Sequence, residues 1–506
     1  MSSESESGMP SVASHPELLL GPNPLFEGVA PFIPYLDLRQ HLNHLPLVNA
    51  NWRSIPPAHR TPLLKLIDDH FVATRVDVQI GDAIQNLLRC HLTMRNPLSR
   101  AEQVRTNRVA LSRSLAVLGS IEILNGFGIL ISGITGTGKT HIVKRALSVF
   151  APEQVISHNN SEVCGWARLD QIVYLHILVP SNGSLGALLP IICRAVDGLI
   201  GTQYRDEYLK EQRRKPNLSN GIAFVCSMLS SHRVAAVVID ENQSENLDRS
   251  PWQDDLRLCF LYMLNAGIGL VLLGNPSAFE NFYESSQVLR RFSDGGIFKL
   301  SRAKSFDEPG WIEYARGMQE FCLVDEVEID PGVRAQWEYQ KSAGLRGLCR
   351  SLQLEAQRQC LRRGGERAVM TIYDLDNALG GPSFVGASKI ASSIYGVTGA
   401  GRFNDLSELS GKSELPPIDQ MALGASDGDG DKRSLPDVVS PDYIQVKLAT
   451  DRRNATRAKN QELKRQKLLA TLPPEDARME GVKEEHIKRA RLLLAEQGTE
   501  RLDEPR

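Results

Sequence analysis

Residues Gly133-Ile134-Thr135-Gly136-Thr137-Gly138-Lys139-Thr140 decide how this chain folds, because they complete the pattern G-x-x-x-x-G-K-[ST]. The apolar run at 127–131 predicts a short buried strand before this stretch, and residues 141–147 predict a helix after it. Glycines at these positions let successive backbone N–H groups point into one hollow, and the start of a helix adds partial positive charge. The stretch therefore predicts a polyphosphate-binding loop between a strand and a helix.

Within this loop we expect Lys139 to reach the β- and γ-phosphates of ATP and the hydroxyl of Thr140 to bind Mg²⁺. The rest of the predicted nucleotide site consists of Gly133, Thr135, Gly136, Thr137, Gly138 and His141. The alternative is a flexible turn rich in glycine and threonine. The flanking strand and helix favour the nucleotide site over that alternative.

A second motif follows at Ala235-Ala236-Val237-Val238-Ile239-Asp240-Glu241, where five apolar residues lead to two acids. Ligands of open parallel sheets bind at the carboxyl ends of the strands. We therefore expect Asp240 to hold Mg²⁺ and Glu241 to polarise the attacking water as a general base. The alternative is an acidic pair that only ends a strand and begins a turn. The phosphate-binding loop upstream favours the catalytic interpretation.

Three further places carry candidate catalytic side chains. Asn275 follows an apolar run and would lie between the attacking water and the γ-phosphate, unless Asn-Pro only forms a turn. Arg290 and Arg291 precede the last predicted strand and are candidates for an arginine supplied to a neighbouring subunit's nucleotide. A solvated helix face is the alternative for this pair. Arg346 begins a predicted helix and is a candidate for a second contact with the phosphates.

The middle of the chain alternates short apolar runs with helical patterns. The predicted strands are 128–132, 172–178, 235–239, 268–273 and 297–300, and the clearest predicted helices are 185–199, 222–231 and 254–265. This alternation predicts an α/β fold in which helices flank a parallel sheet on both faces. Helical patterning at 310–322, 333–340, 347–361 and 371–379 predicts a small helical lid.

These patterns divide the chain into six regions. We expect disorder at 1–20, an N-terminal partner-binding region at 21–104 that begins with an extended arm at about 21–48, the α/β nucleotide-binding domain at 105–305, the lid at 306–395, a linker at 396–440 and a charged helical tail at 441–506. The α/β domain is expected to open with a helix at 105–124. The linker is rich in glycine, serine, aspartate and proline.

Composition narrows the class of protein. The chain has 506 residues and a formal net charge of −2, so its overall charge does not indicate a nucleic-acid partner. It has no apolar stretch near the ~20 residues that span a bilayer, and its N-terminus is polar and acidic, unlike a secretory signal. The eight cysteines include no CxxC pair. We therefore expect a cytoplasmic protein with reduced thiols and no membrane contact.

The phosphate loop, the paired acids, the Gly-Asn strand tip, the arginine pair and the helical lid together resemble the AAA+ ATPases. A more specific block comprises Ile172-Val173-Tyr174-Leu175-His176-Ile177, Asn182-Gly183-Ser184-Leu185 and Arg194-Ala195-Val196-Asp197. This block, with Asn23-Pro24-Leu25-Phe26, is similar to the TnsC/TniB transposition regulators. The resemblance covers most of residues 20–390, and the chain length resembles the long forms from transposons with a TnsA/TnsB transposase.

The resemblance implies an ATPase that assembles on double-stranded DNA as a homo-oligomeric ring or helical filament. It implies that the chain links a TnsD/TniQ-like target selector to a TnsA/TnsB-like transposase, near the bacterial nucleoid, with hydrolysis controlling assembly. The nucleotide residues carried over are Gly133, Gly138, Lys139, Thr140, Asp240 and Glu241. The basic cluster Lys210, Arg213, Arg214 and Lys215, placed between helices, and the basic stretch 447–467 are either DNA contacts or solvated surface.

Two other functions stay open at this point. A replication initiator or helicase loader of the same superfamily would need a DNA-binding domain such as a helix-turn-helix after the lid, where we see a linker and charged helices. A scaffold that binds nucleotide without hydrolysing it is the other possibility. Glu241 argues against the scaffold, because a protein that only binds nucleotide does not need a general base.

Overall fold

A computed structural model describes residues 15–46, 50–112, 114–180, 184–214, 216–242, 253–276, 278–279 and 285–395. The chain divides into two units, Met1–Pro416 and Pro417–Arg506, and every described residue belongs to the first. The predicted linker at 396–440 and tail at 441–506 therefore lie outside the described residues. Residues Pro16–Leu20, within the range expected to be disordered, form a short 3₁₀ helix, η1.

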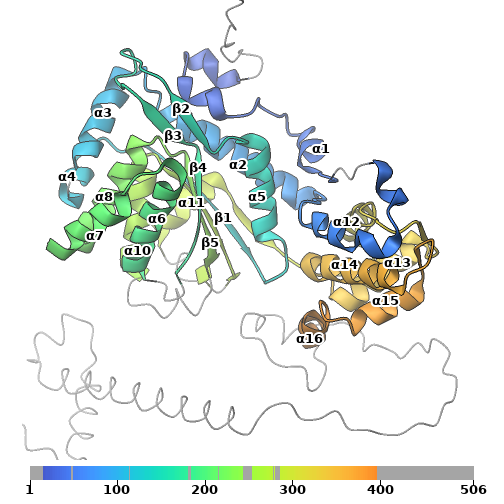
Figure 1. Cartoon of the computed structure of the whole chain (residues 1–506). Coiled ribbons are helices and arrows are strands. Elements are labelled where there is room, and N and C mark those ends of the chain that lie inside the picture. Colours follow the sequence, from blue (N-terminus) through green and yellow to red (C-terminus); the bar gives the residue numbers. More distant parts are fainter. Residues whose placement is uncertain are drawn as a thin grey trace, which may run out of the picture. The chain divides into compact units, whose positions relative to one another are not determined.

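Five parallel strands form the central sheet in the order β4-β5-β6-β1-β7 (Figure 1). The strands are β4 (Tyr174–Leu178), β5 (Ala236–Asn242), β6 (Gly269–Gly274), β1 (Gly128–Gly133) and β7 (Ile297–Leu300). The predicted parallel sheet is confirmed. Strand β6 lies between β1 and β5, so the phosphate loop after β1 and the acids at the end of β5 border the same β6 tip.

Alternate residues of each strand enter two separate cores, as the two-residue period of a strand requires. In β1, Ile129 and Ile131 pack with helices α2 (Arg75–Met94) and α5 (Lys139–Phe150), whereas Leu130 faces the opposite side. That side is covered by α6 (Leu185–Ile200), α8 (Leu218–Ser231), α10 (Gln253–Asn265) and α11 (Ser286–Gly295). Burial on both faces explains the continuous apolar runs of the strands.

Two elements differ from the sequence expectations. The predicted helix at 105–124 is wrong: the structure has α3 (Arg100–Leu111) and α4 (Leu115–Gly119), because the backbone is extended at Ser112 and Ser114 caps α4. The predicted strand at 172–178 is two strands. Residues up to Ile172 belong to an antiparallel hairpin of β2 (Val155–His158) and β3 (Leu169–Ile172), which the sequence did not reveal.

The basic cluster expected between helices is helical in its described part. Lys210, Arg213 and Arg214 lie in the second half of α7 (Tyr204–Arg214), and Lys215 lies outside the described residues. Asp206 and Glu207 occupy the first turn of the same helix, where carboxylates interact favourably with the helix dipole. The three cations are exposed and thus remain candidates for contact with a polyanion.

A group of helices with its own core follows the sheet. They are α12 (Pro309–Gln319), α13 (Pro331–Ser342), α14 (Arg346–Arg363), α15 (Ile372–Leu379) and α16 (Val385–Ile394), with a two-stranded ladder of β8 (Glu326–Val327) and β9 (Val369–Met370). This part corresponds to the predicted lid. No helix among the described residues is both long enough and apolar enough to cross a membrane.

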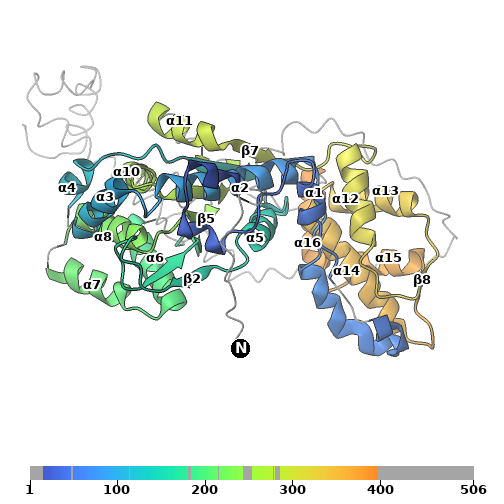
Figure 2. The ribbon, with the colours of Figure 1, turned by 90° about the horizontal axis from the view of Figure 1, so that it is seen from above.

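The N-terminal residues expected as an arm are packed against both parts. Leu25 and Phe26, in η2 (Pro24–Gly28), and α1 (Leu38–Leu42) enter the core around α2 and α5. The chain continues through η3 (Ala50–Ser54) and η4 (Pro57–Asp68) before Phe71 pairs with His44. Helix η4 packs along α14 of the lid (Figure 2). Backbone hydrogen bonds of 2.8 Å between His44 and Phe71 close the base of this excursion, residues 45–70.

Candidate functional site

The loop between β1 and α5 has the curled backbone that its sequence predicts. Gly136 and Gly138 have φ angles of 86° and 97°. These lie in the positive-φ region, where residues other than glycine are strained. At Gly133 a Cβ atom would lie 2.7 Å from the carbonyl oxygen of Leu300 and 2.8 Å from Oγ1 of Thr137. Thr137 in turn donates to the carbonyl of Ile134 at 2.8 Å. The glycines are therefore needed for this shape.

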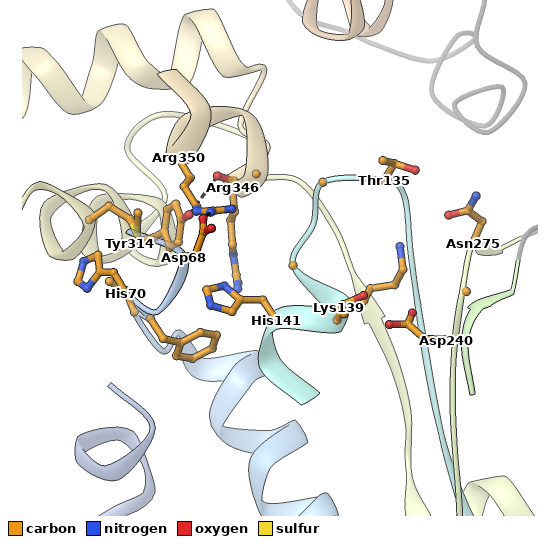
Figure 3. A pocket seen from close by; sticks show the side chains of 18 residues that line it. Asp68, His70, Thr135, Lys139, His141, Asp240, Asn275, Tyr314, Arg346 and Arg350 are labelled. Carbon is orange, nitrogen blue, oxygen red and sulfur yellow. Dashed lines mark hydrogen bonds and ion pairs between the residues drawn. The ribbon is translucent and has the colours of Figure 1, made fainter. Parts of the chain in front are cut away.

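A cavity of about 360 Å³ lies beside the loop, between the strand tips, the lid and the end of the N-terminal excursion (Figure 3). It brings together most of the predicted site: Thr135, Gly136, Gly138, Lys139, Thr140, His141, Asp240, Asn275 and Arg346. Gly133 and Thr137 do not line the cavity, and their contacts with Leu300 and Ile134 set the conformation of the loop. The cavity is large enough for a small-molecule ligand.

The strand tips supply the oxygen donors of the cavity. Asp240, at the end of β5, is 2% exposed, and its Oδ2 lies 3.2 Å from Nε2 of His176 on the neighbouring strand β4. Asn275 follows β6 and is 7% exposed. A carboxylate from Asp240 and a hydroxyl from Thr140 are hard oxygen ligands of the kind that Mg²⁺ prefers. These donors fit a magnesium ion.

Lys139 lies at the start of α5 with its ammonium group folded over the loop. Its Nζ donates to the carbonyl oxygens of Gly133 at 2.5 Å and Ile134 at 3.1 Å. A phosphate oxygen is a stronger acceptor for an ammonium group than a carbonyl oxygen, because the hydrogen bond is then between two ions. The lysine thus fits the contact with phosphate that the motif predicts.

Glu241 occupies the position after Asp240 within β5, where the register of β5 with β6 shifts between Ile239 and Asn242. The structure describes its backbone but not its side chain. The role of Glu241 as a general base therefore stays a prediction.

The two arginines of α11 have different surroundings. Arg291 donates to the carbonyl of Gly126 and to Oδ1 of Asn265, each at 3.1 Å. Arg290 is exposed on the side of α11 away from the buried Val288 and Phe292. Neither arginine lines the described cavity. Arg291 is thus held by its own subunit, and Arg290 is the one of the pair that faces outward.

The lid meets the phosphate loop at the start of α14. The backbone N–H of Gly347 donates to the carbonyl of Gly136 at 2.8 Å. The guanidinium of Arg346 binds Asp77 and Thr74 at the start of α2, and Arg350, one turn later, forms an ion pair with Asp68. The lid is therefore tied to the N-terminal region on the rim of the cavity.

The side of the cavity next to Arg346, away from Asp240 and Asn275, is aromatic (Figure 3). The ring of Phe71 lies edge-on to the ring of His141, with centroids 4.9 Å apart at 84°. Burial lowers the pKa of His141 below its ordinary value of 6.5, with the charge of Asp77 opposing this. His141 is thus neutral at physiological pH. Together with Tyr314 and Met318 of α12, these rings form a surface that suits a flat heterocyclic base.

Several cavity residues were not predicted. The segment 68–72, Tyr314, Met318 and Arg350 come from parts of the chain far from either motif, and no local pattern marked them. His176 appeared only within the family-specific block. The Thr-x-x-Asp pattern of Thr74 and Asp77 is a visible helix-start signal, but nothing in it indicates a partner in the lid.

Residues 126–282 match the AAA domain family (AAA_22). No curated protein sequence shows significant similarity to the chain. Similar solved structures include Orc1 of Aeropyrum pernix in complex with DNA, with 18% identity over 55% of this chain and a TM-score of 0.34. ORC2 of Aeropyrum pernix in ADPNP–ADP complexes has 16% identity over 56% of this chain and 68% of its own, with a TM-score of 0.35. Cdc6p of Pyrobaculum aerophilum has 13% identity over 61% of this chain and 83% of its own, with a TM-score of 0.35. The match spans 64% of the Orc1 chain, less than two thirds of it.

Proposed function

We propose that the AAA+ P-loop domain of this chain binds ATP with Mg²⁺ and hydrolyses it. The observation that carries this proposal is the cavity that joins Lys139 and Thr140 of the loop to Asp240 and Asn275 at the strand tips and to Arg346 of the lid. Basic, hydroxyl and carboxylate groups converge there, as the binding of a magnesium polyphosphate requires.

Each residue then has a separate task in the reaction. The amides of the loop and Lys139 would bind the phosphates, and Thr140 and Asp240 would hold Mg²⁺, whose charge would offset the negative charge of the phosphate oxygens. Glu241 takes up the proton of the attacking water, and Asn275 orients that water against the γ-phosphate. Arg290 reaches the nucleotide of an adjacent subunit. This last step makes the rate of hydrolysis depend on assembly.

The wider role that we propose is regulation of DNA transposition. On this proposal, ATP-bound subunits form rings or filaments on double-stranded DNA and couple a TnsD/TniQ-like selector to a TnsA/TnsB-like transposase. The support is the sequence block at 172–197 that resembles TnsC/TniB proteins, together with the exposed cations Lys210, Arg213 and Arg214 on α7. Repeated by symmetry, a few cations per subunit suffice to follow a phosphate backbone.

Turnover and assembly measured together test this function. We expect phosphate release by the wild type to rise when duplex DNA is added, and ATP with DNA to produce sedimenting assemblies. Glu241→Gln should retain the assemblies and lose turnover, since it keeps the size of the side chain and removes the base. Turnover no higher than background in both the wild type and Glu241→Gln would instead identify a scaffold that does not hydrolyse ATP.

A replication initiator of the AAA+ superfamily is the competing function. It predicts binding of one chain, or a few, to a particular DNA sequence. The transposition regulator predicts that occupancy grows with the length of the duplex, whatever its sequence. Electrophoretic mobility with duplexes of increasing length separates these outcomes.

A further inference from the structure

Strand β4 fixes the backbone of Asp240 at the edge of the nucleotide cavity. The parallel register of β4 with β5 runs without a break up to Leu178, which lies opposite Asp240. The backbone N–H of Val179 then donates to the carbonyl of Asp240 at 3.0 Å. On the other side of β5, the register with β6 shifts between Ile239 and Asn242, so the paired positions of these two strands pass over Asp240. The main chain of Asp240 is therefore held from β4 rather than from β6.

The same strand also holds the carboxylate of Asp240. His176 pairs in register with Val238, two residues before Asp240, so the side chains of all three lie on one face of the sheet. Nε2 of His176 lies 3.2 Å from Oδ2 of Asp240. An ionised carboxylate only accepts hydrogen bonds, so Nε2 is the ring nitrogen that carries the proton in this contact. The imidazole of His176 is thus a donor to the carboxylate.

Burial makes this donor important for the orientation of Asp240. The side chain of Asp240 is 3% exposed and that of His176 is 19% exposed. A carboxylate removed from water needs hydrogen-bond donors or cations beside it, and these partners fix the direction in which it points. Asp240 lines the cavity, whereas His176 does not. An effect of His176 on a ligand in the cavity must therefore pass through Asp240.

We propose that His176 is a positioning residue that sets the orientation in which Asp240 meets Mg²⁺. This inference rests on the proposed binding of ATP with Mg²⁺ in the cavity. Figure 3 shows the carboxylate of Asp240 turned toward Lys139 of the phosphate loop. A carboxylate accepts several hydrogen bonds, so a bond from His176 to Oδ2 is compatible with a metal on the same group. Loss of a hydrogen-bond partner of a metal-binding carboxylate typically costs about 10- to 100-fold in metal affinity.

The chain contains a matched control for this contact. His158 of β2 pairs in register with Leu169 of β3, and its Nε2 lies 2.7 Å from Oε1 of Gln171, two residues further along β3. Both His158 and His176 thus bond a side chain two residues beyond their partner on the neighbouring strand. His158 is 6% exposed and does not line the cavity. Changes at His158 therefore report the loss of such a bond away from the nucleotide.

The test measures the affinity of the full-length chain for Mn²⁺, a spectroscopic substitute for Mg²⁺, from the electron paramagnetic resonance signal of the free ion. The chain is mixed with a non-hydrolysable ATP analogue and kept in excess over it, so that little free nucleotide binds the ion. His176→Phe keeps a flat ring and removes both nitrogens. We expect it to weaken Mn²⁺ binding by about tenfold or more, while its affinity for the analogue in EDTA equals that of the wild type. His158→Phe should lower the thermal midpoint and leave both affinities unchanged.

Two amide substitutions separate positioning from packing. His176→Gln places its amide nitrogen near the position of Nε2 and should restore most of the Mn²⁺ affinity, because the donor to Oδ2 is present again. His176→Asn places that nitrogen near the position of Nδ1, too far from Oδ2, and should bind Mn²⁺ as weakly as His176→Phe. This pair also replaces His176→Phe if the phenylalanine variant folds poorly.

Three results would overturn the inference. The first is an unchanged Mn²⁺ affinity in His176→Phe, or an equal loss in His158→Phe. Tighter Mn²⁺ binding by His176→Phe would mean that the imidazole competes with the metal for Asp240. Equal losses in His176→Gln and His176→Asn would reduce His176 to a support of the fold. Failure of the proposed function itself is seen separately, because the wild type would then bind neither the analogue nor Mn²⁺.

Discussion

Gly347 is the point where a single methyl group should separate the lid from the phosphate loop. A Cβ atom at this position would lie 3.1 Å from both Cα and the carbonyl oxygen of Gly136, closer than ordinary van der Waals contact. The lid must then retreat by a few tenths of an ångström. The 2.8 Å hydrogen bond from the Gly347 N–H to Gly136 lengthens with it. Losing that bond costs about 0.5–1.5 kcal/mol, to which crowding adds about 1 kcal/mol.

Gly347→Ala should therefore weaken nucleotide binding roughly 10- to 50-fold, because about 1.4 kcal/mol corresponds to a tenfold change in Kd. Its free energy of unfolding without nucleotide should fall by only about 0.5–1.5 kcal/mol, since alanine is about 1 kcal/mol more favourable than glycine within a helix and offsets part of this cost. The assay is a titration of a fluorescent ADP derivative, combined with thermal unfolding of the ligand-free chain.

Gly310→Ala is the control for this substitution. Gly310 is the second residue of α12, as Gly347 is of α14, but nothing lies within 4 Å of its Cβ position. It should gain helix stability and bind nucleotide as the wild type does. An unchanged Kd for Gly347→Ala, or the same loss for Gly310→Ala, would refute the claim that this contact closes the site.

Three further predictions concern other parts of the chain. Burial lowers the pKa of His91 from 6.5 to about 3, so between these values only the unfolded state binds a proton at this residue. The free energy of unfolding should therefore fall by about 1.4 kcal/mol for each pH unit below 6.5. Urea unfolding of His91→Gln across that pH range should lack this component. Arg290→Ala should lower DNA-stimulated phosphate release by roughly 10³-fold at unchanged nucleotide affinity. Arg291→Ala should instead lower the free energy of unfolding by about 1–2 kcal/mol, because Arg291 bonds Gly126 and Asn265 of its own subunit. The reverse pattern would contradict the assignment of Arg290 as the outward arginine. Glu102→Gln should destabilise the chain by about 3–5 kcal/mol in denaturant unfolding. The reason is that Glu102 is 5% exposed and forms ion pairs with the buried Arg105 and Arg233. A loss under about 1 kcal/mol would show that these two arginines relax into solvent.

Local sequence patterns predicted the centre of the site. The phosphate loop, the β5 acids and the β6 tip each depend on a few consecutive residues, so their backbone follows from glycine placement and the apolar runs. The strand predicted at 297–300 has the bounds of β7. The spacing of apolar residues around the arginine pair also predicts which of the two faces outward. Val288 and Phe292 mark the buried face of α11, and at 100° per residue Arg290 lies opposite to it while Arg291 lies beside it.

Contacts between distant segments could not be predicted in this way. The excursion at 45–70 packs η4 along α14, and Arg346 binds Asp77 across 269 positions of sequence. Such pairs depend on how the lid sits on the sheet, which no periodicity encodes. The β2–β3 hairpin was missed for a related reason: Ile172 and Tyr174 belong to different sheets although they are two residues apart.

The binding of ATP in the presence of magnesium by purified wild type and Lys139→Ala tests the account most directly. We predict saturable binding of one nucleotide per chain by the wild type in titration calorimetry, and no measurable heat for Lys139→Ala at the same folded stability. Equal binding by the two proteins would contradict the account, as would a wild type that binds no nucleotide.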